Sequence, residues 1–171
     1  TSVNGVSWDI VKVETWGLTS VAGNDETKVV VGEKSIYHFA DDGCWRQIDT
    51  QHQDEIEDLI WTGNQFIASV HQGVLLSRDG KQWEKVVVPG LTDVPAISAD
   101  GSQIIVEDES VKKSSPDGKS WVLIDAENIT AITPWKGKVW GTSYTNSFIY
   151  EYVNNDWKLV MRPSDLFSIT E

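Results

Sequence analysis

The chain has 171 residues, of which 26 are acidic and 14 are basic, so its formal net charge is −12. This length is enough for one well-buried domain that needs neither metals nor disulfides to hold it together. The negative charge repels a phosphate backbone and argues against nucleic acid as a partner. Cys44 is the only cysteine, which excludes internal disulfides and cysteine-rich zinc sites, and no apolar run is long enough for a membrane span.

The predicted elements begin with a turn and an outer strand over residues 2–13, and this turn recurs along the chain. Five tryptophans mark it, at separations of 37, 38, 38 and 36 residues. Two copies are nearly identical, Ser77-Arg-Asp-Gly-Lys-Gln-Trp83 and Ser115-Pro-Asp-Gly-Lys-Ser-Trp121. The first copy has Asn4 in the aspartate place, Asp42-Gly43-Cys44-Trp45 is shortened, and Asn154-Asn155-Asp156-Trp157 is degenerate. Self-similarity at a fixed period of this size indicates a repeat architecture.

Four units follow in chain order, at about residues 16–50, 54–88, 92–125 and 128–162, and each is predicted to contain four short strands. An inner strand starts each unit, in a series headed by Leu18, Ile56, Val94 and Ile129. The runs KVVVGE, QFIASVH, QIIVEDE and KVWGTSY are the second strands, and the strand after each marking tryptophan is the outer one. A last inner strand is predicted over residues 165–171. No segment has a sustained 3.6-residue apolar period, so we expect almost no helix.

Four short antiparallel strands in each unit of about 40 residues predict an all-β fold, the β-propeller. Residues 1–171 are expected to form a single propeller domain with four complete blades and an incomplete fifth built from the two termini. The terminal strands can pair within one chain, two chains can combine into a larger propeller as a homodimer, or the chain is a piece of a longer propeller. Closure within one chain or by a second copy is favoured, because unpaired blade edges are prone to aggregate.

The repeated heptapeptide, which we call the clasp turn, is predicted to be structural. Its glycine tolerates positive φ, its aspartate accepts backbone N–H bonds, and its serine caps the turn. The tryptophan is expected to lie in the groove between neighbouring blades. The residues with this structural role, in all five copies, are Ser2, Asn4, Gly5, Trp8, Asp42, Gly43, Trp45, Ser77, Asp79, Gly80, Trp83, Ser115, Asp117, Gly118, Trp121 and Trp157.

Ser-x-Asp-Gly-x-x-Trp, recurring once in each blade, resembles the Asp-box (bacterial neuraminidase repeat, BNR) family of β-propellers. That family includes sialidases, other glycosidases, sortilin-type receptors and a photosystem assembly factor. The resemblance covers the whole chain through the repeat and implies that the clasp turns are peripheral and structural. It also implies a secreted or cell-surface location, but it does not select a function.

The residues for catalysis that such a family member would need are not evident. A sialidase needs three converging arginines, and Arg46, Arg78 and Arg162 all fall outside the predicted inner strands. No catalytic residue, metal site or cofactor is therefore predicted, with a weak calcium site at the acidic segments 54–58 or 107–109 as the exception. The alternative is a small glycoside hydrolase or lyase that uses Glu57, Asp58 or Glu109.

We therefore predict a non-enzymatic binding or scaffold module, whose ligand is a carbohydrate or a protein. Its site is expected on the face opposite the clasp turns, where the loops are free of scaffold packing. Aromatic rings beside amides and carboxylates suit both ligand classes. The candidate ligand-binding residues on that face are Trp16, His52, His71, Glu109, Tyr144 and Asn146. A structural component of a larger surface or phage assembly is a further alternative.

Overall fold

The computed structural model describes residues 17–50 and 53–167, and within these ranges the chain forms four antiparallel sheets of four strands each. The first two sheets consist of β1 (Ser20–Gly23), β2 (Lys28–Gly32), β3 (Ser35–Phe39), β4 (Trp45–Ile48), β5 (Ile56–Trp61), β6 (Phe66–Val70), β7 (Gly73–Ser77) and β8 (Glu84–Val87). The last two consist of β9 (Ala96–Ala99), β10 (Ile104–Glu107), β11 (Lys112–Ser115), β12 (Val122–Leu123), β13 (Ala131–Trp135), β14 (Lys138–Thr142), β15 (Ile149–Val153) and β16 (Asp156–Met161).

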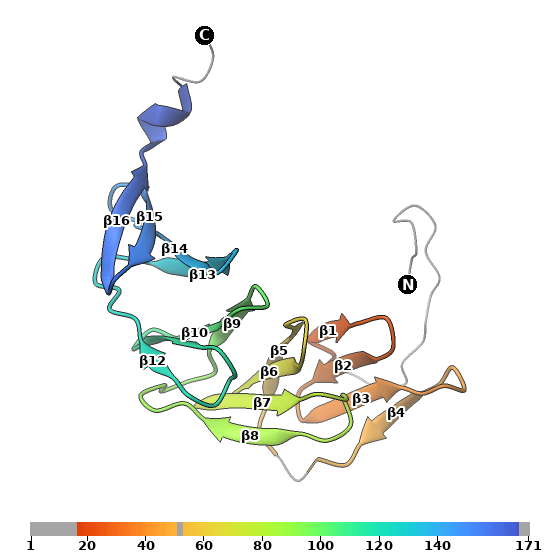
Figure 1. The fold of residues 1–171 in the computed structure, drawn as a ribbon. Coiled ribbons are helices and arrows are strands. Elements are labelled where there is room, and N and C mark those ends of the chain that lie inside the picture. The colour runs from red at the N-terminus through yellow and green to blue at the C-terminus, as the bar shows by residue number, and fades with distance from the viewer. Residues whose placement is uncertain (1–16, 51–52, 168–171) are drawn as a thin grey trace.

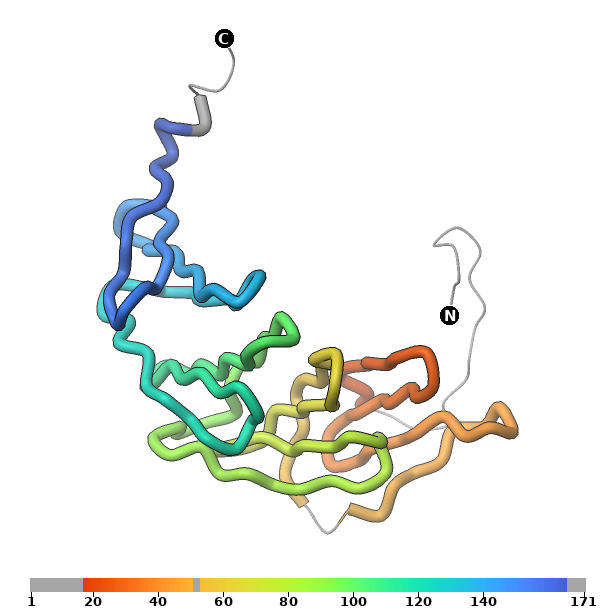
Figure 2. Tube along the Cα trace, viewed as in Figure 1, coloured from red at the N-terminus to blue at the C-terminus, as the bar shows by residue number. Residues whose placement is uncertain are grey.

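Each sheet keeps its strands in sequence order from inner to outer, which is the arrangement of a propeller blade. We number the sheets as blades 1 to 4 in chain order. The inner strands β1, β5, β9 and β13 contact one another in that order, so consecutive blades lie side by side around a common centre. The prediction of a β-propeller with four complete four-stranded blades is confirmed. The four blades form an open arc, with blade 1 and blade 4 at its two ends (Figures 1 and 2).

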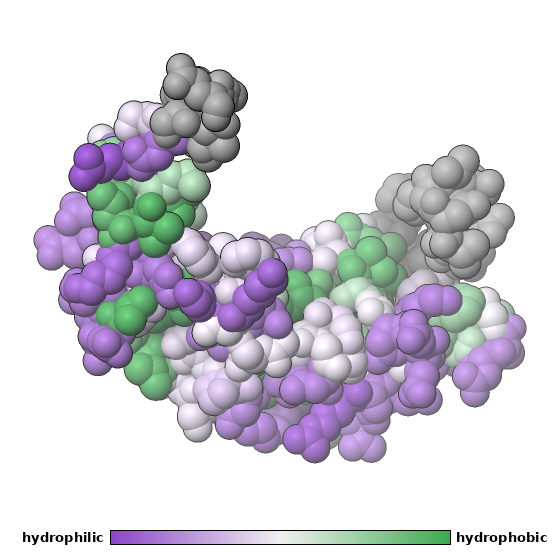
Figure 3. Space-filling model, turned by 45° about the horizontal axis from the view of Figure 1, so that its top comes forward, coloured by the Kyte–Doolittle hydropathy of each residue, from purple (hydrophilic) through white to green (hydrophobic). Residues whose placement is uncertain are grey.

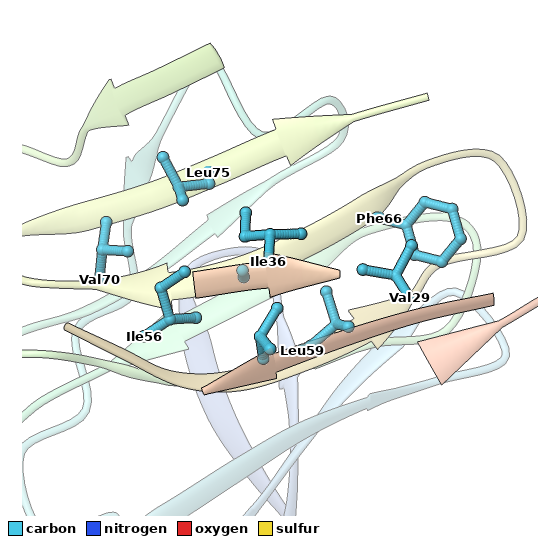
Figure 4. Packing of buried hydrophobic residues seen from close by; sticks show 9 residues of the cluster. Val29, Ile36, Ile56, Leu59, Phe66, Val70 and Leu75 are labelled. Carbon is cyan, nitrogen blue, oxygen red and sulfur yellow. The ribbon is translucent and has the colours of Figure 1, made fainter. Parts of the chain in front are cut away.

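The hydrophobic core lies between the blades as three separate clusters. Blades 1 and 2 enclose the first, which includes Val29, Ile36 and Phe66 with Trp83 packed against it (Figure 4). Blades 2 and 3 enclose the second with Trp121, and blades 3 and 4 enclose the third with Trp157. In each case the tryptophan of one blade packs toward the preceding blade. The second strands β6 and β10, in blades 2 and 3, are buried on both sides because a neighbouring blade covers each of their faces, whereas β14 in blade 4 is buried mainly on one side.

The two full clasp turns, residues 77–83 and 115–121, have the same hydrogen bonds. In the first, the Ser77 hydroxyl oxygen accepts from Gly80 N at 2.9 Å, and Asp79 Oδ1 accepts from Lys81 N and Gln82 N, both at 2.8 Å. The indole Nε1 of Trp83 donates to Gly80 O at 3.2 Å. The second turn repeats these bonds at 2.8 to 3.0 Å. One side chain thus serves several backbone donors that a tight turn leaves without strand partners.

The glycine of each full clasp turn also touches the preceding blade. Gly80 has φ of +70°, and a Cβ there would lie 2.6 Å from Cγ2 of Val29 in blade 1. Gly118 has φ of +78°, and its Cβ would lie 2.8 Å from a methyl carbon of Leu76 in blade 2. The clasp turn therefore connects blades as well as strands, because the backbone at glycine packs against the neighbouring core.

The two shorter copies of the clasp turn form the same hairpin with different backbone interactions. In blade 1, Ala40 stands in the serine place, and Gly43 N donates to the backbone oxygen of Ala40 at 2.9 Å instead of to a hydroxyl. In blade 4, Asn154 and Asn155 both have positive φ, 53° and 61°, which is the conformation of a two-residue type I′ hairpin. Trp157 Nε1 finds its acceptor in the preceding blade, Asp125 O at 2.6 Å.

The C-terminal segment departs from the prediction. Residues 165–171 were expected to begin a further inner strand, but Pro163–Phe167 form the 3-10 helix η1. Proline fixes φ for a first helical turn, and the Asp165 carboxylate accepts a bond from Arg162 N at 2.8 Å, which favours a helical start. The predicted N-terminal strand over 2–13, with Ser2, Asn4, Gly5 and Trp8, lies outside the described residues, as do 168–171.

Candidate functional site

The loops of the four blades divide between two faces of the propeller. In an antiparallel blade the inner-to-second and third-to-outer turns lie at one end, and the second-to-third turns and blade connections lie at the other. We call the second end the loop face. A bond on this face ties one connection to the next blade: Thr92 N, after blade 2, donates to Asp108 Oδ2 in the β10–β11 turn at 2.7 Å. The clasp turns lie on the opposite face.

Four of the six predicted ligand residues lie in described turns of the loop face, in three different blades. His71 is in the β6–β7 turn, Glu109 is in the β10–β11 turn, and Tyr144 and Asn146 are in the β14–β15 loop. Trp16 and His52 lie outside the described residues. The structure brings Tyr144, Asn146 and Glu109 to the neighbouring blades 3 and 4. It leaves His71 in blade 2, exposed, with its Nδ1 3.8 Å from Asp93 Oδ1.

Two hollows occupy the loop face at blades 3 and 4. The first, which we call the acidic hollow, measures about 350 Å³ and is lined by Asp108, Glu109, Ser110, Val111, Lys112, Leu123, Ile124, Asp125, Ala126, Glu127 and Ile129. The second, the amide hollow, also measures about 350 Å³ and is lined by Glu127, Asn128, Ile129, Ser143, Thr145, Asn146, Tyr150 and Trp157. Since Glu127 and Ile129 line both, the two hollows are adjacent.

The connection between blades 3 and 4 forms the ridge that separates the hollows. Ile129 is buried in the core between the two blades, and its N–H donates to Ala126 O at 2.9 Å. Asn128 has φ of +70°, a left-handed turn that asparagine tolerates better than most residues. With Ile129 anchored below, the exposed side chains of Glu127 and Asn128 stay on the surface of the loop face.

Hydrogen bonds fix the side chains that line the amide hollow. Asn146 Nδ2 donates to the Tyr150 hydroxyl at 3.0 Å, and Asn146 Oδ1 accepts from Phe148 N at 2.9 Å. The Ser143 and Thr145 hydroxyls lie 2.9 Å apart at the rim. Tyr144 beside them is 87% exposed, so its ring is open to a ligand.

The Asp108 carboxylate stabilises one wall of the acidic hollow. Burial raises the pKa of Asp108, but hydrogen bonds from the N–H groups of Thr92 and Val111 outweigh this effect, so the pKa is lowered below its ordinary value of 3.8. The carboxylate is thus a structural anion that joins blade 3 to the connection before it. The sequence reasoning missed this role, although an aspartate followed at three residues by a strand is a common turn signal.

Of the carboxylates of the hydrolase alternative, Glu57 and Asp58 are neighbours in blade 2, and Glu109 lies apart from them in blade 3. Asp58 lies on inner strand β5, where its Oδ1 accepts from the Ser20 hydroxyl at 2.9 Å and from Leu59 N at 2.7 Å. These bonds join blade 2 to blade 1. Glu57 beside it is exposed, and Glu109 belongs to a turn of blade 3.

The arginines also remain apart. Arg46 pairs with Asp42 in blade 1, Arg78 lies within a clasp turn of blade 2, and Arg162 stacks on Phe148 in blade 4 at 5.8 Å. Over residues 17–50 and 53–167, no group of three or more His, Cys, Asp or Glu side chains is placed to hold a metal ion. In the same part of the chain, none of the helices has the length and apolar character needed to cross a membrane.

A larger hollow, of about 650 Å³, lies between the two full clasp turns. Most of its polar groups already bind one another: Gln65 Nε2 donates to Asp117 O at 3.0 Å, and Lys119 Nζ lies 2.6 Å from Glu84 Oε2. The Asp79 and Asp117 carboxylates are committed to their own turns. This hollow is therefore a seam between clasp turns, and the pair on the loop face is the better candidate for a ligand.

Comparison with known proteins identifies the fold. No protein-family model and no curated protein matches the chain. The computationally designed Ika4 protein is similar with a TM-score of 0.65 at 15% identity, over 91% of this chain and 99% of Ika4. The designed Ika8 protein is similar with a TM-score of 0.59 at 15% identity, over 84% of this chain and 48% of Ika8.

Apo AztD from Citrobacter koseri is similar with a TM-score of 0.59 at 15% identity, over 85% of this chain. The match covers 46% of AztD, so the chain corresponds to about half of that protein. At these identities the likeness concerns the propeller fold alone.

Proposed function

We propose that this chain is a non-enzymatic binding module of the Asp-box β-propeller type, and that its ligand is a neutral carbohydrate bound at the two hollows of blades 3 and 4. The observation that carries the proposal is the pair of adjacent polar hollows on the loop face, one of them lined by the β14–β15 loop that also carries the exposed Tyr144. Assignment to the Asp-box family rests on the repeated heptapeptide and is supported by the matching hydrogen bonds of its two full copies.

The chemistry of the hollows suits a sugar. A sugar hydroxyl both donates and accepts, and the amides of Asn128 and Asn146 offer both kinds of partner while the Glu127 carboxylate accepts. Tyr144 can pack its ring on the apolar face of a sugar ring, since it is 87% exposed. The net charge of −12 disfavours an anionic ligand.

A binding role fits the carboxylates of the hydrolase alternative, Glu57, Asp58 and Glu109, better than hydrolysis does. Two catalytic carboxyl groups must flank one glycosidic bond, within about 10 Å of each other. Asp58 is engaged at the blade 1–blade 2 junction, whereas Glu109 borders the acidic hollow in blade 3. A protein ligand on the same loop face is the remaining possibility.

A glycan array followed by calorimetric titration of the best neutral glycan tests the proposal. Tyr144→Ala and Asn146→Ala are expected to weaken binding by ten-fold or more, while His71→Ala, on the same face but in blade 2, leaves it unchanged. An array without signal, combined with specific capture of a protein that Tyr144→Ala abolishes, assigns the face to a protein. Turnover of a glycoside that Glu109→Gln abolishes overturns the non-enzymatic role.

A further inference from the structure

The two ends of the arc present blade faces that no described blade covers. In every described junction, a blade face packs on the next blade through apolar side chains. Within residues 17–50 and 53–167, no blade covers the N-terminal side of blade 1 or the C-terminal side of blade 4. Figure 3 shows apolar surface on both arms of the arc. We call these surfaces the leading face, on blade 1, and the trailing face, on blade 4.

The trailing face has the composition of a blade junction. Along β13 exposed and buried residues alternate, and Trp135 on the exposed side is 55% exposed. Trp140 pairs with Thr133 across β13 and β14 and therefore lies on the same side. The two indole rings lie 6.1 Å apart. In blade 2, the cross-strand pair that corresponds to Thr133 and Trp140 is Ile60 and Ile67, and it packs against blade 3. Trp140 thus occupies a position that meets a following blade elsewhere in the chain.

The leading face has the matching property. Val21, Tyr37 and Trp45 lie on the side of blade 1 away from the blade 1–blade 2 core, and Val21 is 66% exposed. The equivalent tryptophans of blades 2 to 4 each pack on the preceding blade, and their Nε1 atoms have acceptors. In contrast, Nε1 of Trp45 is buried without a partner, and the same is true of Trp140 on the trailing face. Both faces therefore carry an indole whose N–H group has no hydrogen-bond acceptor among the described residues.

Charge makes the two faces complementary. At the junction of blades 3 and 4, the inner hairpins meet: Gly137 N in the β13–β14 turn donates to Asp100 Oδ2 in the β9–β10 turn at 2.7 Å. The inner hairpin of blade 4 exposes Lys136, and the inner hairpin of blade 1 exposes Asp25 and Glu26. If a trailing face meets a leading face with the same geometry, these opposite charges become neighbours.

We infer that two copies of this chain join head to tail, the trailing face of each against the leading face of the other, and close one ring of eight blades. The faces differ from each other, so the contact is heterologous, and it closes with two copies when the arc spans half of the ring. The four blades match about half of the designed Ika8 chain, so a chain about twice as long contains a segment similar to this arc.

Light scattering after size exclusion, at micromolar protein, tests the inference. The wild type is expected to have twice the chain mass of 19.1 kDa. Trp135→Asp is expected to give a monomer, whereas Val87→Asp, an exposed residue of outer strand β8 in blade 2, remains a dimer. Circular dichroism checks that each variant is folded. A monomeric wild type overturns the proposal and leaves closure to the chain's own ends.

A charge exchange tests which faces meet. Lys136→Glu alone and Asp25→Lys/Glu26→Lys alone each place like charges at both contacts, so each is expected to weaken the dimer by ten-fold or more. An equimolar mixture of the two proteins restores opposite charges at both contacts and is expected to dimerise as the wild type does. Two variants that stay dimeric alone, or a mixture that stays monomeric, rules out this pairing of faces.

Discussion

At the scale of single residues, the clasp turns depend on the carboxylates of Asp79 and Asp117. Burial raises the pKa of Asp79, but the bonds from Gln82 N and Lys81 N outweigh it, and the pKa is lowered. For Asp117 the bonds from Ser120 N and Lys119 N are the main cause of a lowered pKa. A charged acceptor binds backbone N–H groups more strongly than a neutral one, so the turns are held best when both groups are ionised.

The carboxylates of Asp79 and Asp117 make the stability of the fold depend on pH in the acidic range. Because their folded pKa values lie below the ordinary 3.8, their contribution is complete above that pH and is lost as the pH falls through the lowered values. We expect Asp79→Asn/Asp117→Asn to be less stable than the wild type at pH 7 but to lose less on acidification from pH 5 to pH 2. Thermal unfolding across this range measures it, with Asp25→Asn as the control. Parallel curves for the wild type and the double variant would contradict this assignment.

Alanine substitutions of two clasp-turn glycines distinguish the cost of backbone strain from the cost of crowding the preceding blade. Gly80→Ala places a Cβ 2.6 Å from Val29 Cγ2 at φ of +70°, whereas Gly43→Ala has φ of +80° with nothing within 4 Å. We expect Gly43→Ala to cost about 1 kcal/mol for the left-handed backbone, and Gly80→Ala to cost a further 1–3 kcal/mol for overpacking. Urea unfolding of both variants measures the difference. Equal losses of unfolding free energy in the two variants would show that blade 1 accommodates the added Cβ at no cost in stability.

At the scale of elements, the junction of blades 3 and 4 contains a hydrogen bond that joins two inner hairpins. Asp100 Oδ2 accepts from Gly137 N, and Asp100 Oδ1 holds its own hairpin through Ser102 N at 3.0 Å. We expect Asp100→Ala to cost about 1–2 kcal/mol and to increase hydrogen exchange in β13 and β14 more than in β5 and β6.

The first blade offers the matched control for that experiment. Asn24 Oδ1 accepts from Glu26 N and Thr27 N within its own hairpin, at 2.9 and 2.7 Å. Asn24→Ala therefore removes the capping of a hairpin without removing a bond between described blades, and it is expected to leave exchange in β13 and β14 unchanged. Faster exchange there in both variants would mean that the effect of Asp100→Ala is a general loss of stability and not the loss of the bond between the two hairpins.

The elements differ in how far they can be predicted from the sequence. The strands were predictable because they are β-branched runs between turns, and their order followed from the period of Trp45, Trp83, Trp121 and Trp157. The 3-10 helix at Pro163–Phe167 was not, since the apolar series that suggested a strand says nothing about whether a neighbouring strand is present to pair with it. The loop-face hollows were predictable as a region only, because the ridge at Ile129 depends on packing between two blades.

At the scale of the whole molecule, the sequence predicted the number of complete blades but not the curvature of the arc. Curvature depends on the angle at which one blade packs on the next, and this angle is set by side-chain volumes in the three cores. The ends of the arc then decide which surfaces stay uncovered. Trp135 and Val21 are ordinary blade residues in the sequence, and their exposure emerges only from the assembled arc.

The charge of the whole chain leads to a last prediction. With a net charge of −12, the folded state carries self-repulsion that salt screens, since the Debye length falls from about 30 Å at 0.01 M to about 3 Å at 1 M. We expect the melting temperature at pH 7 to rise by several degrees between 0.02 and 0.5 M NaCl. At pH 4.5, the sequence isoelectric point, the net charge is near zero and the rise should largely vanish, although the lowered pKa values keep Asp79 and Asp117 ionised. An equal rise at both pH values would point to preferential exclusion of salt from the protein surface rather than to screening of the net charge.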